Sequence, residues 1–252
     1  MTIVEFFGPP ATGKTFFYNQ IKKEFQKQDI FFCSYNDFFF KYAFKEINFN
    51  MLDYVTLFYF FFIHKKNTYI PNIKIKLDNS NYIKKTKNKS VSLYFSNFFF
   101  INYQNIISKL YIKLKPKNYK LFNFYKKNII KKNNSNTLKK NYLRWFKKLC
   151  VERLLINKYS KDKKYVFFVD EGFYQRSFAF IDNQKTNFKI VNQYFKLIPK
   201  VDYLLMSTIN AAIFKKRIQQ RKKNLKMFQY KNYNEIVYYK KVFKKITKLI
   251  KT

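Results

Sequence analysis

The stretch Gly8-Pro9-Pro10-Ala11-Thr12-Gly13-Lys14-Thr15 decides the fold of this chain. It follows the pattern of a glycine, four further residues, a glycine, a lysine, and a serine or threonine. The short apolar run before it, residues 3–7, predicts a strand, and the apolar spacing after it predicts a helix over about residues 15–27. A strand, a glycine loop and a helix in this order indicate the start of an α/β fold.

Glycine is used in only two places in this sequence. The chain has three glycines: Gly8 and Gly13 frame the loop, and Gly172 follows an apolar run that ends in Asp170 and Glu171. Glycine is needed where the backbone approaches another group closely or turns with a positive φ. We therefore expect the two segments to form one site.

The loop is the P-loop pattern, and its chemistry is phosphate binding. Backbone N–H groups of residues 8–15 can wrap a phosphate, and the start of the following helix adds the positive end of its dipole. Lys14 is expected to neutralise phosphate charge, and the Thr15 hydroxyl is expected to bind Mg²⁺. ATP and Mg²⁺ are therefore the predicted cofactors. The alternative is a chance match in a solvated turn.

A second candidate segment follows the apolar run at residues 165–169. An acidic residue at the carboxyl end of a strand lies beside the ligand in an open parallel sheet. Asp170 is expected to hold Mg²⁺, directly or through water, and Glu171 to act as a base or to orient water. Because many strands end in aspartate, a structural role for Asp170 is the alternative.

The composition is strongly basic. The chain has 252 residues, which predicts one domain with or without a large insertion, and a net charge of +38. Such a charge is typical of proteins that bind nucleic acid or an anionic membrane. However, the abundant Lys, Asn, Phe, Tyr and Ile are all residues of A/T-rich codons, so a compositional bias would give the same charge. We favour the bias.

Only five of the basic residues are arginine, and these are Arg144, Arg153, Arg176, Arg217 and Arg221. Where lysine replaces arginine freely, a retained arginine points to a site that needs a planar, bidentate donor. Arg144 and Arg153 lie off the apolar stripe of a helix predicted over residues 139–158, so we expect them to be solvated charges.

Other features exclude several classes of site. Cys33 and Cys150 are isolated and are expected to be buried in a reducing cytoplasm, and the only histidine, His64, is expected at the surface. The first residues lead directly into a strand, which predicts no signal peptide. The apolar stretches 52–63 and 91–112 are too short or too polar for a membrane span, and they predict buried or amphipathic helices. An interfacial membrane role remains open for both.

The chain contains two kinds of segment: those with an α/β pattern, and one in which aromatic clusters are separated by Lys/Asn runs. Residues 1–46 predict a first β-α-β unit, with a second strand at 30–33. Residues 47–140 hold aromatic clusters between Lys/Asn runs, and they predict a helical insertion that forms a lid or substrate side. Strands are expected again at 165–169 and 201–206, and helices at about 210–223 and 234–250.

Three segments together resemble the P-loop kinases of nucleotides and small molecules. They are residues 8–15, residues 169–176, and residues 199–205 followed by Arg217 and Arg221; thymidylate kinases and deoxynucleoside kinases are the nearest group. The resemblance implies a three-layer P-loop (Rossmann-like) α/β fold, in which a parallel sheet is flanked by helices. The helical insertion at residues 47–140 departs from the family's pattern. The resemblance also implies that Arg176 contacts the acceptor or its phosphate, and that Arg217 and Arg221 clamp the transferred phosphoryl group or stack on the adenine.

Three functions follow from these observations. The first is Mg²⁺/ATP-dependent phosphoryl transfer to a small acceptor of the nucleoside, nucleotide or sugar type, in the cytoplasm. The second is an ATPase that acts on nucleic acid through the basic insertion, since an Asp-Glu pair is typical of ATPases that activate water. The third is a non-enzymatic P-loop protein at a membrane surface. The sequence leaves the acceptor and the oligomeric state open.

Overall fold

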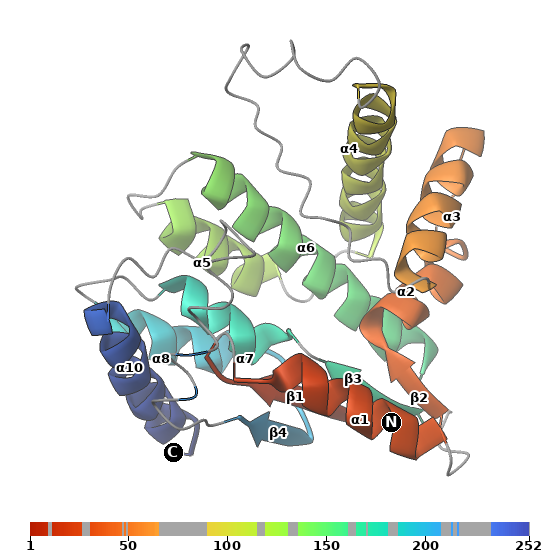
Figure 1. Ribbon diagram of the computed structural model, residues 1–252. Helices are drawn as coiled ribbons and strands as arrows, with labels where there is room; N and C mark the ends of the chain where they lie inside the picture. Colours follow the sequence, from red (N-terminus) through yellow and green to blue (C-terminus); the bar gives the residue numbers. More distant parts are fainter. Residues whose placement is uncertain are drawn as a thin grey trace.

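The structure of this chain is a computed structural model. It describes residues 1–9, 12–26, 31–46, 48, 50–65, 90–114, 119–130, 136–160, 165–169, 171–180, 186–207, 213, 216 and 233–251. The chain has a mixed α/β architecture in which helices outweigh strands (Figure 1).

A parallel sheet lies at the base of the fold. Its strands are β1 (Thr2–Phe7), β2 (Phe31–Ser34), β3 (Tyr165–Val169) and β4 (Tyr203–Met206). They pair in the order β2-β3-β1-β4, and all three pairings are parallel. The α/β class and the parallel sheet expected from the sequence are thus confirmed, and each predicted strand is present within one or two residues of its expected position.

The two central strands are buried on both faces. In β1, Ile3 and Phe7 join the main hydrophobic core, whereas Val4 and Phe6 form a smaller cluster on the opposite face. This smaller cluster is covered by helix α1 (Lys14–Gln26). Strands buried on both sides are near-continuous apolar runs, which is why β1 and β3 were readable from the sequence. The edge strand β4 alternates between exposed and half-buried residues.

The other face of the sheet carries a stack of helices. The described elements there are α2 (Tyr35–Ala43), α3 (Met51–Lys65), α4 (Ser90–Lys113), α5 (Tyr119–Ile130), α6 (Asn136–Tyr159), α7 (Phe173–Arg176), the 3-10 turn η2 (Ser177–Phe180), α8 (Phe188–Leu197) and α10 (Tyr233–Lys251). Helix α6 lies in the middle of this stack and packs against α2, α4 and α5 (Figure 1). Within the described residues, no helix is both long enough and apolar enough to cross a membrane.

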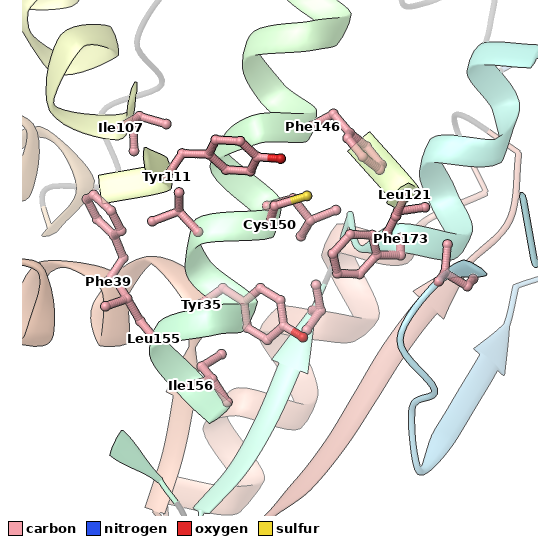
Figure 2. Close-up of a cluster of buried hydrophobic side chains, with 14 of the residues drawn as sticks. Tyr35, Phe39, Ile107, Tyr111, Leu121, Phe146, Cys150, Leu155, Ile156 and Phe173 are labelled. Atoms are coloured by element: carbon pink, nitrogen blue, oxygen red, sulfur yellow. The ribbon is translucent and has the colours of Figure 1, made fainter. Parts of the chain in front are cut away.

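Aromatic side chains fill the core. The rings of Tyr125 and Phe146 stack with their centroids 3.8 Å apart. Figure 2 shows Cys150 enclosed by core side chains that include Phe146 and Phe173. Burial raises the pKa of the Cys150 thiol well above its usual range, so this cysteine is an inert core residue, as the sequence predicted. The side chain of Cys33 lies outside the described part of the chain.

The expectation of a solvated Arg153 is wrong. Helix α6 has neighbours on several sides, so a residue off its apolar stripe is also buried. One terminal nitrogen of the Arg153 guanidinium donates to the Lys200 carbonyl at 3.0 Å, and the other lies 3.4 Å from the Tyr35 hydroxyl. Arg153 therefore ties α6 to the start of α2 and to the approach to β4. Arg144 is half-buried, with its guanidinium 5.7 Å from the centre of the Phe100 ring.

Candidate active site

The candidate site begins where β1 ends. The backbone leaves the sheet at Phe7, and α1 begins at Lys14. Gly13 has a φ of 93°, a conformation that residues with a side chain rarely adopt. Its carbonyl accepts the N–H groups of Phe16 at 3.0 Å and Phe17 at 3.1 Å, which forms the first turn of α1. The predicted order of strand, glycine loop and helix is thus present, with the N-terminus of α1 next to the loop.

Lys14 lies inside the loop rather than in solvent. The side chain is buried, and its Nζ donates to the carbonyl of Gly8 at 3.0 Å and to that of Pro9 at 3.1 Å. An ammonium group held by two loop carbonyls is placed to meet an anion that enters the loop. A phosphate oxygen there would compete with these carbonyls for the same three protons.

A residue that sequence reasoning missed closes the loop on the β4 side. Ser207 follows β4, and its N–H donates to the Phe7 carbonyl at 2.9 Å. The Ser207 and Thr12 hydroxyl oxygens are 2.6 Å apart, and Thr12 also donates to the Pro9 carbonyl at 2.9 Å. A methyl group added to Gly8 would lie only 2.7 Å from the Ser207 carbonyl oxygen. Gly8 is thus required by the close approach of two backbone segments.

The acidic segment after β3 is bonded to both β1 and the loop. The side-chain oxygen of Gln175 accepts the Gly8 N–H at 3.2 Å, and the Gln175 N–H donates to the Glu5 carboxyl at 3.1 Å. A methyl group on Gly172 would collide with the Glu5 side chain. We call these contacts among Glu5, Gly8, Gly172 and Gln175 the bracket. It joins the segment that contains Glu171 and Arg176 to the strand that leads into the loop.

Glu5 is the second residue that sequence reasoning missed. It is 1% exposed, and it lies on the same face of β1 as Ile3 and Phe7. Burial is the largest effect on the Glu5 carboxyl group, and it raises the pKa to about 8. The N–H groups of residues 173–175 and the positive charge of Arg176 lower the pKa by smaller amounts. The signal was a single carboxylate in an otherwise apolar strand. Strand periodicity alone could not show that the short helix α7 covers it.

Glu171 and Arg176 are brought together by the same short segment. The Arg176 Nη2 lies 3.2 Å from the Glu171 Oε2, and the guanidinium lies 5.6 Å from the centre of the Trp145 ring on α6. The Glu171 side chain is 60% exposed, whereas Arg176 is mostly buried. The Arg176 Nε is buried without an acceptor among the described residues. The Arg176 guanidinium therefore pairs with Glu171 through one terminal nitrogen, and its Nε–H donor has no acceptor among the described residues.

Some predicted site residues lie outside the described part of the chain. They are Pro10, Ala11, Asp170, Arg217 and Arg221. Thr15 lies in the first turn of α1, but its side chain is not described. Within the described residues, no group of three or more histidine, cysteine or carboxylate side chains could hold a metal ion. The Mg²⁺ site at Thr15 and Asp170 stays a prediction.

Comparisons with protein-family models, with curated proteins and with solved structures found no match to this chain. The assignment of a function therefore rests on the chain's own residues and on the geometry of the loop and the bracket.

Proposed function

We propose that this protein is a P-loop phosphotransferase that moves the γ-phosphoryl group of ATP to a small acceptor of the nucleoside, nucleotide or sugar type. The observation that carries the proposal is the position of Lys14. Its ammonium lies inside a glycine loop at the N-terminus of α1, and that loop is bonded through Gln175 to the segment with Glu171 and Arg176. Phosphoryl transfer requires mainly positioning and charge neutralisation, and these residues supply both.

Each part of the site has a proposed role. Lys14 and the first N–H groups of α1 bind the phosphates of ATP. Arg176, with its Nε still without an acceptor in the described region, binds the acceptor or its phosphate, and Glu171 orients that arginine. Thr15 and Asp170 would hold Mg²⁺, which supplies charge neutralisation when it is bound. Arg217 and Arg221 are proposed as the phosphoryl clamp.

The sheet supports placing the chain among three-layer P-loop folds. Strand β1, which leads into the loop, is central and pairs directly with β3. Because parallel neighbours end at the same edge of a sheet, the acidic segment after β3 lies beside the loop. Helix α1 covers one face of the sheet, and the main core lies against the other.

The ion pair favours transfer over hydrolysis. A carboxylate that activates water must accept its proton, but Glu171 is bonded to Arg176 on the same segment. An arginine positioned by such a pair suits recognition of an anionic or polar acceptor better than activation of water. This is the reason that we place the kinase before the nucleic-acid-dependent ATPase.

The test is transfer of label from γ-labelled ATP to pooled nucleosides, nucleotides and sugars, with Mg²⁺ present. We expect one acceptor to gain label with the wild type and with Lys196→Ala, which changes an exposed lysine on α8, but not with Lys14→Ala. Arg176→Lys should raise KM for the acceptor more than KM for ATP. ATP binding without transfer to any acceptor would refute the kinase. Hydrolysis that rises when nucleic acid is added would establish the ATPase instead.

A further inference from the structure

Helix α3 has an apolar surface on the side that faces away from the core. Its inward side chains, such as Thr56, Leu57 and Phe60, are buried. On the opposite face, Met51, Val55, Phe58 and Phe62 are spaced along one line of the helix and are 83%, 44%, 54% and 56% exposed. We call these four residues the α3 stripe. A helix that is apolar all round is normally buried on all sides. In the described part of the chain the stripe stays largely exposed, although the Phe58 ring lies 6.1 Å from that of Phe44.

Helix α4, the neighbour of α3, also has exposed apolar side chains. It packs beside α3, where the rings of Tyr59 and Phe99 stack at 4.7 Å and Asn102 donates to the Thr56 hydroxyl at 2.9 Å. On α4, Phe98 and Ile101 are exposed. Figure 1 shows α3 and α4 standing out together at the end of the molecule opposite α10 and β4.

The described carboxylates near this surface are buried, whereas several lysines are exposed. From α2 to α6, the carboxylates with described side chains are Glu46, Asp53 and Glu152, and all three are buried. Each pairs with a lysine: Lys158 at 2.7 Å, Lys109 at 3.0 Å and Lys148 at 3.1 Å, respectively. Exposed lysines lie on or directly after the two helices that pack against α3, and they are Lys41 on α2, Lys45 just after α2, and Lys113 on α4. We call these three residues the lysine rim. The described surface of these helices therefore presents apolar groups and cations without an exposed carboxylate.

We propose that the α3 stripe docks this protein on an anionic membrane surface. The apolar side chains enter the boundary between headgroups and acyl chains, and the surrounding lysines contact the anionic headgroups. A second copy of the chain fits less well, because self-association would bring two lysine rims together. Single-stranded nucleic acid needs cations among the stacking rings, and residues 51–62 contain neither lysine nor arginine.

The docking surface is separate from the candidate active site. The bracket lies on β1 and α7, and the loop precedes α1, whereas the stripe lies on α3. Membrane binding is therefore expected without ATP and in the Lys14→Ala variant. Its failure would leave the proposed phosphotransferase untouched.

The experiment is flotation of the full chain with two kinds of vesicle: phosphatidylcholine alone, and phosphatidylcholine with about one third phosphatidylserine. We expect the protein to float with the anionic vesicles only. Phe58→Ser/Phe62→Ser should weaken this binding by about tenfold or more, because two large apolar groups no longer leave water. The control Leu197→Ser/Leu205→Ser changes two exposed apolar residues on α8 and β4 and should float like the wild type.

Four results would overturn the proposal. They are an absence of binding to anionic vesicles, equal binding by the stripe variant and the wild type, a stripe-dependent dimer in sedimentation that excludes vesicles, and a preference for single-stranded RNA over vesicles that the stripe variant loses. Thermal unfolding of each variant checks that it is folded, and all four substituted residues are exposed, so folding is expected to be retained.

Discussion

Replacing Glu5 by glutamine should stabilise this protein at neutral pH. The carboxyl group of Glu5 is buried in the middle of β1, and burial raises its pKa from 4.5 to about 8. Glutamine has nearly the same shape as the protonated acid. It keeps an oxygen that can accept the Gln175 N–H, and it carries no charge to desolvate. The variant therefore removes the free-energy cost of keeping this carboxyl group protonated at neutral pH, and it leaves the bracket in place.

The size and sign of the effect follow from the two pKa values. Below pH 4.5 the carboxyl group is protonated in both folded and unfolded chains, so it costs nothing. As pH rises toward 8, the unfolded chain loses this proton while the folded protein keeps it, and the folded state is progressively disfavoured. Between pH 4.5 and 8, each pH unit lowers the free energy of unfolding by about 1.4 kcal/mol, so the loss at pH 7 is about 3 kcal/mol.

The assay is urea unfolding at several pH values between 5 and 8, followed by the fluorescence of the single tryptophan, Trp145. Glu5→Gln should exceed the wild type's free energy of unfolding by about 1 kcal/mol at pH 5 and by about 3 kcal/mol at pH 7. Glu24→Gln, the same change at an exposed position on α1, is the matched control for the substitution itself. A wild type that is the more stable protein at pH 7, by a margin that grows with pH, would refute the reasoning. It would mean that Glu5 is ionised and held by its N–H donors and Arg176.

Two further substitutions test the packing. Gly8→Ala and Gly172→Ala should each cost about 3 kcal/mol in urea unfolding, because the first methyl group meets the backbone carbonyl of Ser207 and the second meets the buried, hydrogen-bonded side chain of Glu5; a variant as stable as the wild type would contradict the corresponding contact. Tyr125→Phe should raise the free energy of unfolding by about 1 kcal/mol, since the Tyr125 hydroxyl is buried without a partner in the described part of the chain, and a loss of stability would show that it has one.

The sequence predicted those features that local patterns specify. Residues 2–26 form a strand, a glycine loop and a helix as expected, because the apolar period changes at the two glycines. The buried strand at 165–169 and the long helix α6 were found for the same reason. In each case, consecutive residues carry the whole signal.

Features that depend on distant segments were not predictable in this way. The role of Glu5 depends on a helix 168 residues later in the chain, and the burial of Arg153 depends on Tyr35 and Lys200. The attachment of Gln175 to the loop and the inward turn of every described carboxylate from α2 to α6 are likewise products of packing. A single sequence shows which residues are apolar or charged, but not which surface will cover them.

The strand order β2-β3-β1-β4 also has a consequence for synthesis on the ribosome. Strand β1 is made first, yet its two neighbours are β3 and β4, which begin at Tyr165 and Tyr203. At usual translation rates, roughly 10 to 30 s pass between the synthesis of β1 and that of β3, its first partner strand. The nascent chain thus carries the future centre of the sheet unpaired until β3 has been made. Efficient folding in the cell is expected to depend on a chaperone that shields the N-terminal segment until β3 emerges.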